Sequence, residues 1–389
     1  MPPLPQPFTI DVPEAVLEDL RQRLARTRWP DEIPHSGWQY GTNLAYLQAL
    51  VAYWQHTYDW RAQERLLNRF PQYRVQLGDV TLHFIHQPGQ GPAPLPLLLL
   101  HGWPSSVYEF LSVIEPLTNP AAHGGDAADA FSVVVPSLPG YAFSHVPHQR
   151  RLDLEEMAAL LQRLMVEVLG YSRFAAHGGD WGAFLAARLG YAYPEHLLGI
   201  HLTMVPVAPH PSERTDLSPA EAAFLKEAEA FRREEAGYQW IQGTKPQTLA
   251  YALTDSPVGL AAWITEKFYA WTDCGGDLER RVSKDALLTT IMLYWVTQSI
   301  NSSFWLYYQL YHHPWRLGRG ERIAVPTAVA AFPREILRPP REWAARVCNL
   351  QRWTPMPAGG HFAALEEPAA LVADLRAFFR TLRSGGAPP

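Results

Sequence analysis

Two short runs made almost entirely of apolar residues constrain the fold of this chain more than any other feature. LPLLLL occupies residues 95–100, and FSVVVP occupies residues 131–136. A strand can be apolar on every side chain where both faces of its sheet are buried, as in parallel sheets that helices cover on each side. Each run therefore predicts a buried parallel strand.

Further strands and helices alternate with these two along the chain. Residues 80–87 alternate in polarity as a strand does, and apolar runs predict strands at 198–205, 324–332 and 349–356. Residues 154–168 carry apolar side chains at helical spacing. This repeated order predicts an α/β fold with a doubly wound, mainly parallel sheet and right-handed crossovers.

Two parts of the chain lack this alternation and show mainly helical patterns. We expect residues 1–75 to form an N-terminal helical arm and residues 209–318 to form a helical cap. The sheet domain then consists of residues 76–208 and residues 319–389. In this division the cap is an insertion that lies over the site of the sheet domain.

The segment HGWPSSVYEF follows the first apolar strand and is expected to begin a helix. Ser106 and Glu109 stand three residues apart in it, which is the spacing of a capping box. We therefore assign the Glu109 side chain to the N-terminus of that helix.

The sequence GGDWG at residues 178–182 has the pattern G-x-D-x-G, where serine hydrolases have G-x-S-x-G. Gly178 and Gly182 would allow a strand to turn sharply into a helix, and Asp180 would sit at the positive end of that helix. A simple aspartate N-cap in a glycine-rich turn would give the same letters. The strand before and the helix after favour a nucleophile elbow.

An aspartate nucleophile indicates attack on a saturated carbon. A serine that attacked such a carbon would form an ether, which water does not readily cleave. Asp180 would form an alkyl ester, which water can hydrolyse at the carbonyl of the aspartate itself. Aspartate is also ionised at neutral pH and needs no base for the first step. The predicted substrate is therefore an epoxide or an alkyl halide.

The base and the acid of a triad are expected late in the chain, in the order nucleophile, acid, histidine. His361 stands in a Gly-Gly loop just before the last helical pattern, which favours it as the base. Glu335 is the one carboxylate in AAFPREILRPP, the loop after the preceding strand, and a solvated pair with Arg334 is the alternative. We interpret Glu366 and Glu367 as charges at a helix N-terminus.

Oxyanion and alkoxide charges need hydrogen-bond donors close to the nucleophile. The backbone N–H groups of Trp181, directly after Asp180, and of Trp103, in HGWP, are the candidates for the oxyanion. Tyrosine suits the alkoxide of an opened epoxide because its phenol stays protonated near neutral pH. The sequence spacing does not choose among the tyrosines of the cap, which are Tyr238, Tyr251, Tyr269, Tyr294, Tyr307, Tyr308 and Tyr311.

Taken together, these motifs resemble the epoxide hydrolases of the microsomal and juvenile-hormone type over nearly the whole chain. The resemblance includes PFTIDVPEAVLEDLRQRLARTRWPDE, HGWPSS, GGDWG, GYQWIQGTKPQTLAYALTDSPVGLAAWI, FPREI and GGHFAALEEP. It implies an α/β-hydrolase fold and a cofactor-independent hydrolase that forms vicinal diols from small apolar epoxides and water. It also implies Asp180 as nucleophile, His361 as base and Glu335 as the acid that orients the base.

The family's two cap tyrosines correspond to Tyr238, in GYQWIQ, and to Tyr307, in SSFWLYYQL. Tyr308 is adjacent to the second position, and the local match does not choose between the two.

Animal members carry an N-terminal membrane anchor, whereas this chain begins at the arm. The resemblance therefore implies a soluble enzyme without a membrane anchor.

Composition excludes several other classes. A net charge of −5, with scattered Lys and Arg, gives no basic stripe for nucleic acid. Cys274 and Cys348 offer no disulfide framework and no zinc motif, so we expect no metal, no cofactor and a reducing, cytoplasmic compartment. No apolar segment reaches the roughly 18 residues of a membrane span. Homo-oligomer formation stays open.

Two alternatives accompany the epoxide hydrolase hypothesis. A haloalkane dehalogenase would use the same Asp180 ester and would bind the halide through indole or amide N–H groups. A non-catalytic ligand-binding protein could share the scaffold, although it would not need to keep nucleophile, base, acid and oxyanion turn together.

Overall fold

The computed structural model describes residues 3–383 and contains a nine-stranded sheet in the order β1-β2-β3-β5-β4-β6-β7-β8-β9. The strands are β1 (Gln6–Phe8), β2 (Gln72–Leu77), β3 (Val80–Gln87), β4 (Leu95–Leu100), β5 (Phe131–Pro136), β6 (Phe174–Gly178), β7 (Leu197–Leu202), β8 (Ile323–Ala331) and β9 (Cys348–Pro355). Pairing is antiparallel from β1 to β5 and parallel from β5 to β9. The predicted α/β class with a mainly parallel sheet is confirmed.

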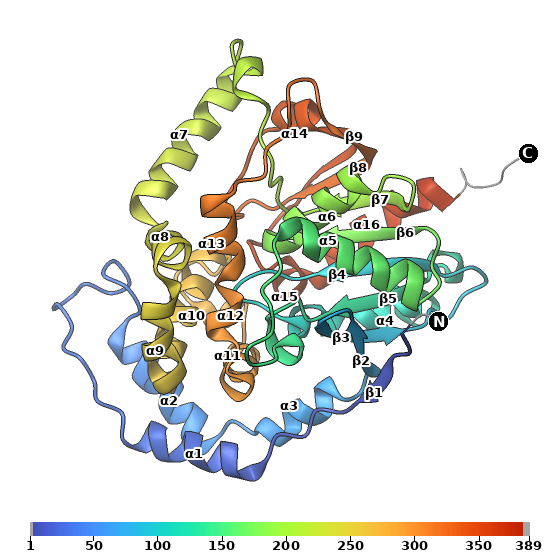
Figure 1. Cartoon of the computed structure of the whole chain (residues 1–389). Helices are drawn as coiled ribbons and strands as arrows, with labels where there is room; N and C mark the ends of the chain where they lie inside the picture. The colour runs from blue at the N-terminus through green and yellow to red at the C-terminus, as the bar shows by residue number, and fades with distance from the viewer. Residues whose placement is uncertain (1–2, 384–389) are drawn as a thin grey trace, which may run out of the picture.

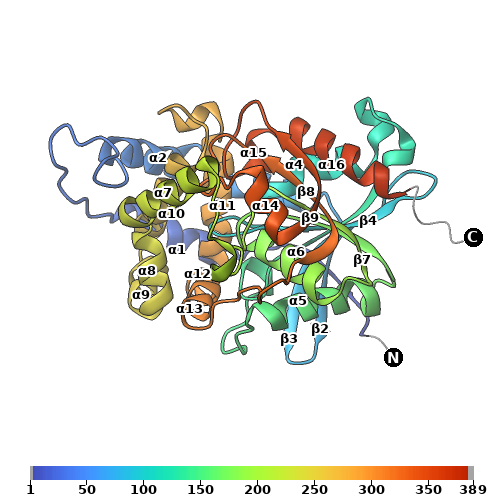
Figure 2. The ribbon, with the colours of Figure 1, turned by 90° about the horizontal axis from the view of Figure 1, so that it is seen from above.

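Helices cover both faces of this sheet (Figure 2). On one face α4 (Leu111–Thr118) packs beside α16 (Pro368–Arg383), and on the other α5 (Leu154–Arg163) packs beside α6 (Asp180–Ala192). The expected helix at 154–168 ends as an α-helix at Arg163 and continues as a π-helical turn. The two apolar runs form β4 and β5 with the predicted bounds, and nearly all of their side chains are buried.

Between β7 and β8 the chain forms a group of helices on one side of the sheet domain (Figure 1). They are α7 (Pro219–Glu234), α8 (Gly237–Thr244), α9 (Pro246–Asp255), α10 (Pro257–Trp271), α11 (Lys284–Thr297), α12 (Ile300–Ser303) and α13 (Trp305–His312). Two short helices, α14 (Arg341–Val347) and α15 (Ala363–Glu366), follow in the last part of the chain.

The N-terminal segment combines helices with strands. Helices α1 (Glu14–Ala25), α2 (Leu44–His56) and α3 (Trp60–Leu67) run along the edge of the molecule, and α1 and α2 contact α10 (Figure 1). The purely helical pattern expected for residues 1–75 missed β1 and the beginning of β2, which extend the sheet. Three residues of β1 are too few to show an alternating pattern, so periodicity could not detect this strand.

The tightest backbone contacts of the fold lie where β6 turns into α6. A Cβ atom on Gly182 would stand 1.9 Å from the carbonyl oxygen of Leu100 in β4, and one on Gly178 would stand 2.2 Å from the Gly182 carbonyl. Backbone atoms cannot move away as flexible side chains can. Glycine at these positions is therefore a steric requirement of the turn.

We predict that Gly182→Ala destabilises the protein by about 3 kcal/mol, since overpacking against backbone lies at the high end of such costs. The matched control is Gly237→Ala in the first turn of α8, where a Cβ atom would meet nothing within 4 Å. The control should leave stability unchanged or raise it by about 0.5 kcal/mol. Thermal unfolding by circular dichroism measures both, and equal melting temperatures for the two variants would contradict the prediction.

Candidate active site

Asp180 occupies the first position of α6 in a strained backbone conformation. Its φ angle is 45°, in the left-handed region that residues other than glycine seldom adopt. Gly102, in the loop after β4, approaches so closely that a Cβ atom there would stand 2.3 Å from the Cβ of Asp180. This strained turn between β6 and α6 is the backbone arrangement of a nucleophile elbow, and the Asp180 side chain lines a cavity.

The imidazole of His361 lies between two carboxylates. Its Nε2 atom is 3.4 Å from Oδ2 of Asp180, and its Nδ1 atom is 2.6 Å from Oε1 of Glu335. Glu335 follows β8 and His361 follows β9, so neighbouring parallel strands bring them together. Both side chains are 2% exposed. The alternative of a solvated pair between Glu335 and Arg334 is wrong, because Arg334 is 62% exposed and faces Asp273 instead.

This arrangement controls the protonation of His361. Burial alone lowers the pKa of the imidazole, but the charges and hydrogen bonds of Glu335 and Asp180 outweigh burial and hold it well above its ordinary value. The resting site therefore contains an imidazolium ion. An ester on Asp180 would remove one of the two negative charges, which lowers the pKa of His361 and leaves it able to act as a base.

The two oxygens of Asp180 have different partners. The backbone N–H of Trp103 donates to Oδ1 at 2.8 Å, while Oδ2 faces His361. Trp181 follows Asp180 in the first turn of α6, where backbone N–H groups lack an acceptor within the helix. The two N–H groups predicted for an oxyanion hole thus come from the loop after β4 and from the first turn of α6.

Two tyrosines of the helices after β7 extend to the same carboxylate. Tyr238 of α8 and Tyr307 of α13 line a cavity of about 280 Å³ together with Asp180 and Trp181. Their ring centroids are 5.7 Å apart, and both side chains are buried. Burial is the main cause that raises the pKa of each phenol, and the charge of Asp180 adds to it. Both therefore stay protonated and are able to donate.

The structure brings Tyr307, and not Tyr308, into this cavity. Tyr308 stacks on Trp305 and His312, with centroid distances of 5.4 Å and 4.2 Å, and does not line the cavity. Tyr238 accepts a hydrogen bond from the Gln239 side chain at 2.8 Å. Within residues 3–383, the hydroxyl of Tyr307 has no hydrogen-bond partner. Among the remaining tyrosines of residues 209–318, Tyr311 also lines the cavity, but it is 50% exposed.

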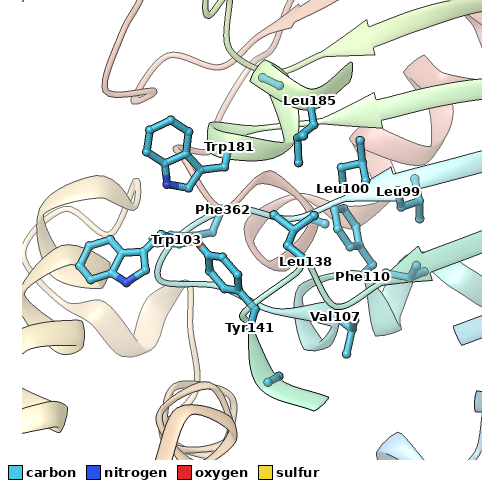
Figure 3. Close-up of a cluster of buried hydrophobic side chains, with 14 of the residues drawn as sticks. Leu99, Leu100, Trp103, Val107, Phe110, Leu138, Tyr141, Trp181, Leu185 and Phe362 are labelled. Atoms are coloured by element: carbon cyan, nitrogen blue, oxygen red, sulfur yellow. The ribbon is translucent and has the colours of Figure 1, made fainter. Parts of the chain in front are cut away.

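Aromatic side chains surround these polar groups. Figure 3 shows Trp103, Trp181, Tyr141 and Phe362 gathered around the strand ends. The indole of Trp103 stacks on Tyr238 with centroids 5.5 Å apart, and that of Trp181 meets Tyr307 edge-on at 4.6 Å. These contacts fix the two phenols and give the site apolar walls.

Glu366 lies in the first turn of α15, as expected for a charge at a helix N-terminus, but its side chain also makes contacts beyond that helix. Its buried carboxylate accepts backbone hydrogen bonds from Asp273 at 2.7 Å, Gly360 at 3.0 Å and Phe362 at 3.1 Å. The backbone N–H of His361 also donates to the backbone carbonyl of Trp271 at 2.9 Å. Glu366 thus ties the loop that carries His361 to the end of α10. Only the fold brings these distant groups together, so no local pattern could have revealed the role.

Lys267 is a second residue that sequence reasoning missed. It is 5% exposed, pairs with Glu266, and holds its ammonium 4.7 Å from the ring centroid of Tyr238. Trp263 and Trp271 provide two further rings around the same ammonium. A lysine within the apolar run AAWITEKFYAW is the one signal that the sequence offers.

The part of the chain that the structure describes contains no cluster of three or more His, Cys, Asp or Glu residues able to hold a metal ion. Cys274 and Cys348 are both buried and free. Across residues 3–383, no helix combines the length and the apolar character that crossing a membrane requires.

The sheet, the strained elbow and the carboxylate–imidazole–carboxylate arrangement define an α/β-hydrolase with an aspartate at the nucleophile position. In agreement, the family described as alpha/beta hydrolase fold matches residues 96–243, and the family described as Epoxide hydrolase N terminus matches residues 5–110.

Comparison with whole relatives is more specific. A Stigmatella aurantiaca relative is 46% identical over 97% of this chain and 85% of its own length. Epoxide hydrolase 1 of Oryctolagus cuniculus is 37% identical over 96% of this chain and 88% of its own. The crystal structure of juvenile hormone epoxide hydrolase from Bombyx mori superposes with a TM-score of 0.86 and 29% identity, covering 98% of this chain and 96% of that one.

The chain belongs to the epoxide hydrolase family. The resemblance drawn from the sequence motifs is thereby confirmed, and so are the α/β-hydrolase fold and the hydrolase activity. Membership argues against the dehalogenase and the binding protein, since the named relatives are epoxide hydrolases.

We predict that Asp180→Asn lowers the pKa of His361. The substitution removes one of the two negative charges that hold this pKa up, and burial then opposes protonation more effectively. In the wild type, raising the pH should remove the imidazolium proton only well above the ordinary range. NMR titration of His361 measures the difference, with the exposed Asp216→Asn as control. An unchanged pKa in Asp180→Asn would contradict the coupling.

Proposed function

We propose that Asp180, His361, Glu335, Tyr238 and Tyr307 convert small apolar epoxides to vicinal diols through an ester on Asp180. The observation that carries this proposal is the placement of one carboxylate between two sets of groups. One set is a pair of buried, protonated phenols across a cavity, and the other is the Trp103 N–H and His361.

In the first half of the reaction, Oδ2 of Asp180 attacks one carbon of the epoxide. A new C–O bond forms as the ring C–O bond breaks, and the epoxide oxygen leaves as an alkoxide. Tyr238 and Tyr307 donate hydrogen bonds to that oxygen and supply its proton. The His361 proton can then restore the phenol, which leaves an Asp180 ester, a neutral imidazole and two phenols.

In the second half, water adds to Cγ of the Asp180 ester and His361 takes one of its protons. The carbonyl oxygen becomes an oxyanion that the backbone N–H groups of Trp103 and Trp181 stabilise. Its collapse breaks the bond to the alkyl oxygen and releases the diol. Asp180 returns as a carboxylate and His361 as an imidazolium, which Glu335 holds in place.

The substrate class follows from the cavity walls. Apart from Asp180, the side chains that line the cavity carry no charge, and most are aromatic or aliphatic. A charged substrate would lose its hydration there without a partner. We therefore propose an uncharged, mainly apolar epoxide as the substrate.

We further propose that residues 209–318 act as the cap that supplies the two phenols, while residues 1–75 brace it. The contacts of α1 and α2 with α10 support this division. Residues 76–208 and 319–389 would form the hydrolase domain, although residues 384–389 of this range lie outside the described part of the chain. The two free, buried cysteines support a reducing compartment such as the cytoplasm.

A His361→Gln variant should stop at the covalent ester. We expect the intact mass of this variant, after incubation with styrene oxide, to rise by the mass of the whole epoxide, because no base remains to activate water. His313→Gln, which changes an exposed histidine, should give no adduct and keep wild-type turnover.

Incubation of the same variant with 1-bromohexane distinguishes the alternatives. A mass gain equal to the alkyl group without bromine, together with none from epoxides, would favour a dehalogenase. If neither compound adds to His361→Gln and the wild type turns over neither, the proposed ester mechanism fails for these substrates.

We predict that Tyr307→Phe slows formation of the ester by about tenfold or more, because one of two proton donors is lost. Its neighbour provides a matched control, since Tyr308→Phe removes a hydroxyl that does not line the cavity. Single-turnover kinetics with styrene oxide measure both variants. The reverse result, with Tyr308→Phe slow and Tyr307→Phe normal, would assign the second donor to Tyr308.

A further inference from the structure

A second, much smaller cavity also borders Asp180. It has about 10 Å³ of space for the centre of a water molecule, which is room for one water. Its walls include Asp180 and His361 together with Ser105 and Glu109 from the segment after β4. Asp180 is the one residue that lines both this cavity and the substrate cavity.

This position matches what hydrolysis of an Asp180 ester requires. The alkyl group would occupy the substrate cavity with the two phenols, so the attacking water has to reach Cγ from another direction. The small cavity touches both Asp180 and the base His361. A single water in it would stand beside its target and its proton acceptor at the same time.

The cavity wall contains an acid to which the triad assigns no task. Glu109 lies in the 3₁₀ turn Val107–Phe110, and within residues 3–383 it forms no ion pair. The expected capping box is wrong, because the Ser106 hydroxyl accepts from the Tyr108 N–H while Glu109 lines the cavity.

The charge state of Glu109 depends on the groups around it. Burial raises the pKa of Glu109 to about 7, the side chain of Ser105 and the charge of His361 oppose this rise, and the carboxylates of Asp180 and Glu366 reinforce it. Ser105, Asp180 and His361 also line the small cavity that would hold the water. Glu109 is therefore ionised above neutral pH and protonated below it.

We propose that Glu109 is the positioning residue for the hydrolytic water, holding one of its hydrogens while His361 takes the other as a proton. This inference rests on the proposed ester mechanism. Two fixed hydrogen bonds aim a lone pair of the water at Cγ, which a single bond to His361 would leave free to rotate.

The step balances without another reactant. The water oxygen forms a bond to Cγ, one proton passes to Nε2 of His361, and the second hydrogen stays on the added oxygen in a hydrogen bond to Glu109. When the tetrahedral intermediate collapses, the bond from Cγ to the alkyl oxygen breaks. The alkoxide takes the hydrogen that stayed on the added oxygen and becomes the diol, which leaves Asp180 as a carboxylate and His361 as an imidazolium.

Single-turnover kinetics of Glu109→Gln with styrene oxide test the proposal. An amide oxygen accepts a weaker hydrogen bond than a carboxylate, so we expect ester hydrolysis to slow by about tenfold or more. Ester formation should stay within about twofold of wild type, because Glu109 does not line the substrate cavity. The ester should then accumulate in quenched samples analysed by intact mass. Glu115→Gln, on the exposed face of α4, is the matched control.

The pH dependence gives a second readout that needs no variant to fold. In the wild type, ester hydrolysis should fall as the pH drops below the pKa of Glu109, which is raised by burial to about 7 in the resting site. The ionisation of His361 adds a second fall to the same profile. The Glu109→Gln variant should lose the fall in rate that comes from Glu109 and keep the fall that comes from His361. The Glu109→Asp variant should restore the fall that comes from the carboxylate in part.

Two outcomes would overturn the proposal. One is a Glu109→Gln variant that hydrolyses its ester at the wild-type rate with the wild-type pH profile. The other is equal slowing of ester formation and hydrolysis, which indicates general damage to the site. Failure of the ester mechanism itself would differ from both, because then no ester would appear in wild type or in His361→Gln.

Discussion

The buried arrangement of one imidazole between two carboxylates determines how this site can work. At rest, the negative charges of Asp180 and Glu335 hold a proton on His361, so the histidine cannot act as a base before it is needed. Ester formation neutralises Asp180 and leaves Glu335 as the one remaining partner. The nucleophile thus switches on its own base by reacting, and Glu335 keeps the ring oriented throughout.

The proposed reaction uses different groups around Asp180 in its two halves. The phenols of Tyr238 and Tyr307 line the substrate cavity, whereas His361 and Glu109 line the separate small cavity. The carboxylate of Glu366 joins the His361 loop to the end of α10 through backbone hydrogen bonds. The segment after α10 and the loop that carries His361 are therefore joined directly beside the site.

Much of this site could be predicted from the sequence, because strand order places it. Asp180 follows the buried strand β6 in a glycine turn, and Glu335 and His361 follow β8 and β9 of the same parallel part of the sheet. The remaining residues depend on contacts that local patterns do not encode. Whether Tyr307 or Tyr308 faces the cavity depends on the rotation of α13, and Glu109 was misassigned because its spacing from Ser106 imitates a capping box.

The contact between Trp103 and Asp180 explains why an oxyanion hole suits an aspartate as well as a serine. A serine hydrolase directs these N–H groups at the carbonyl of its substrate, whereas here the carbonyl belongs to the nucleophile. The Trp103 N–H already holds Oδ1 at 2.8 Å in the resting enzyme. The same oxygen would be the carbonyl of the ester and then the oxyanion, so its donor needs no rearrangement. Because Oδ1 is held, Oδ2 is left as the oxygen that attacks the epoxide.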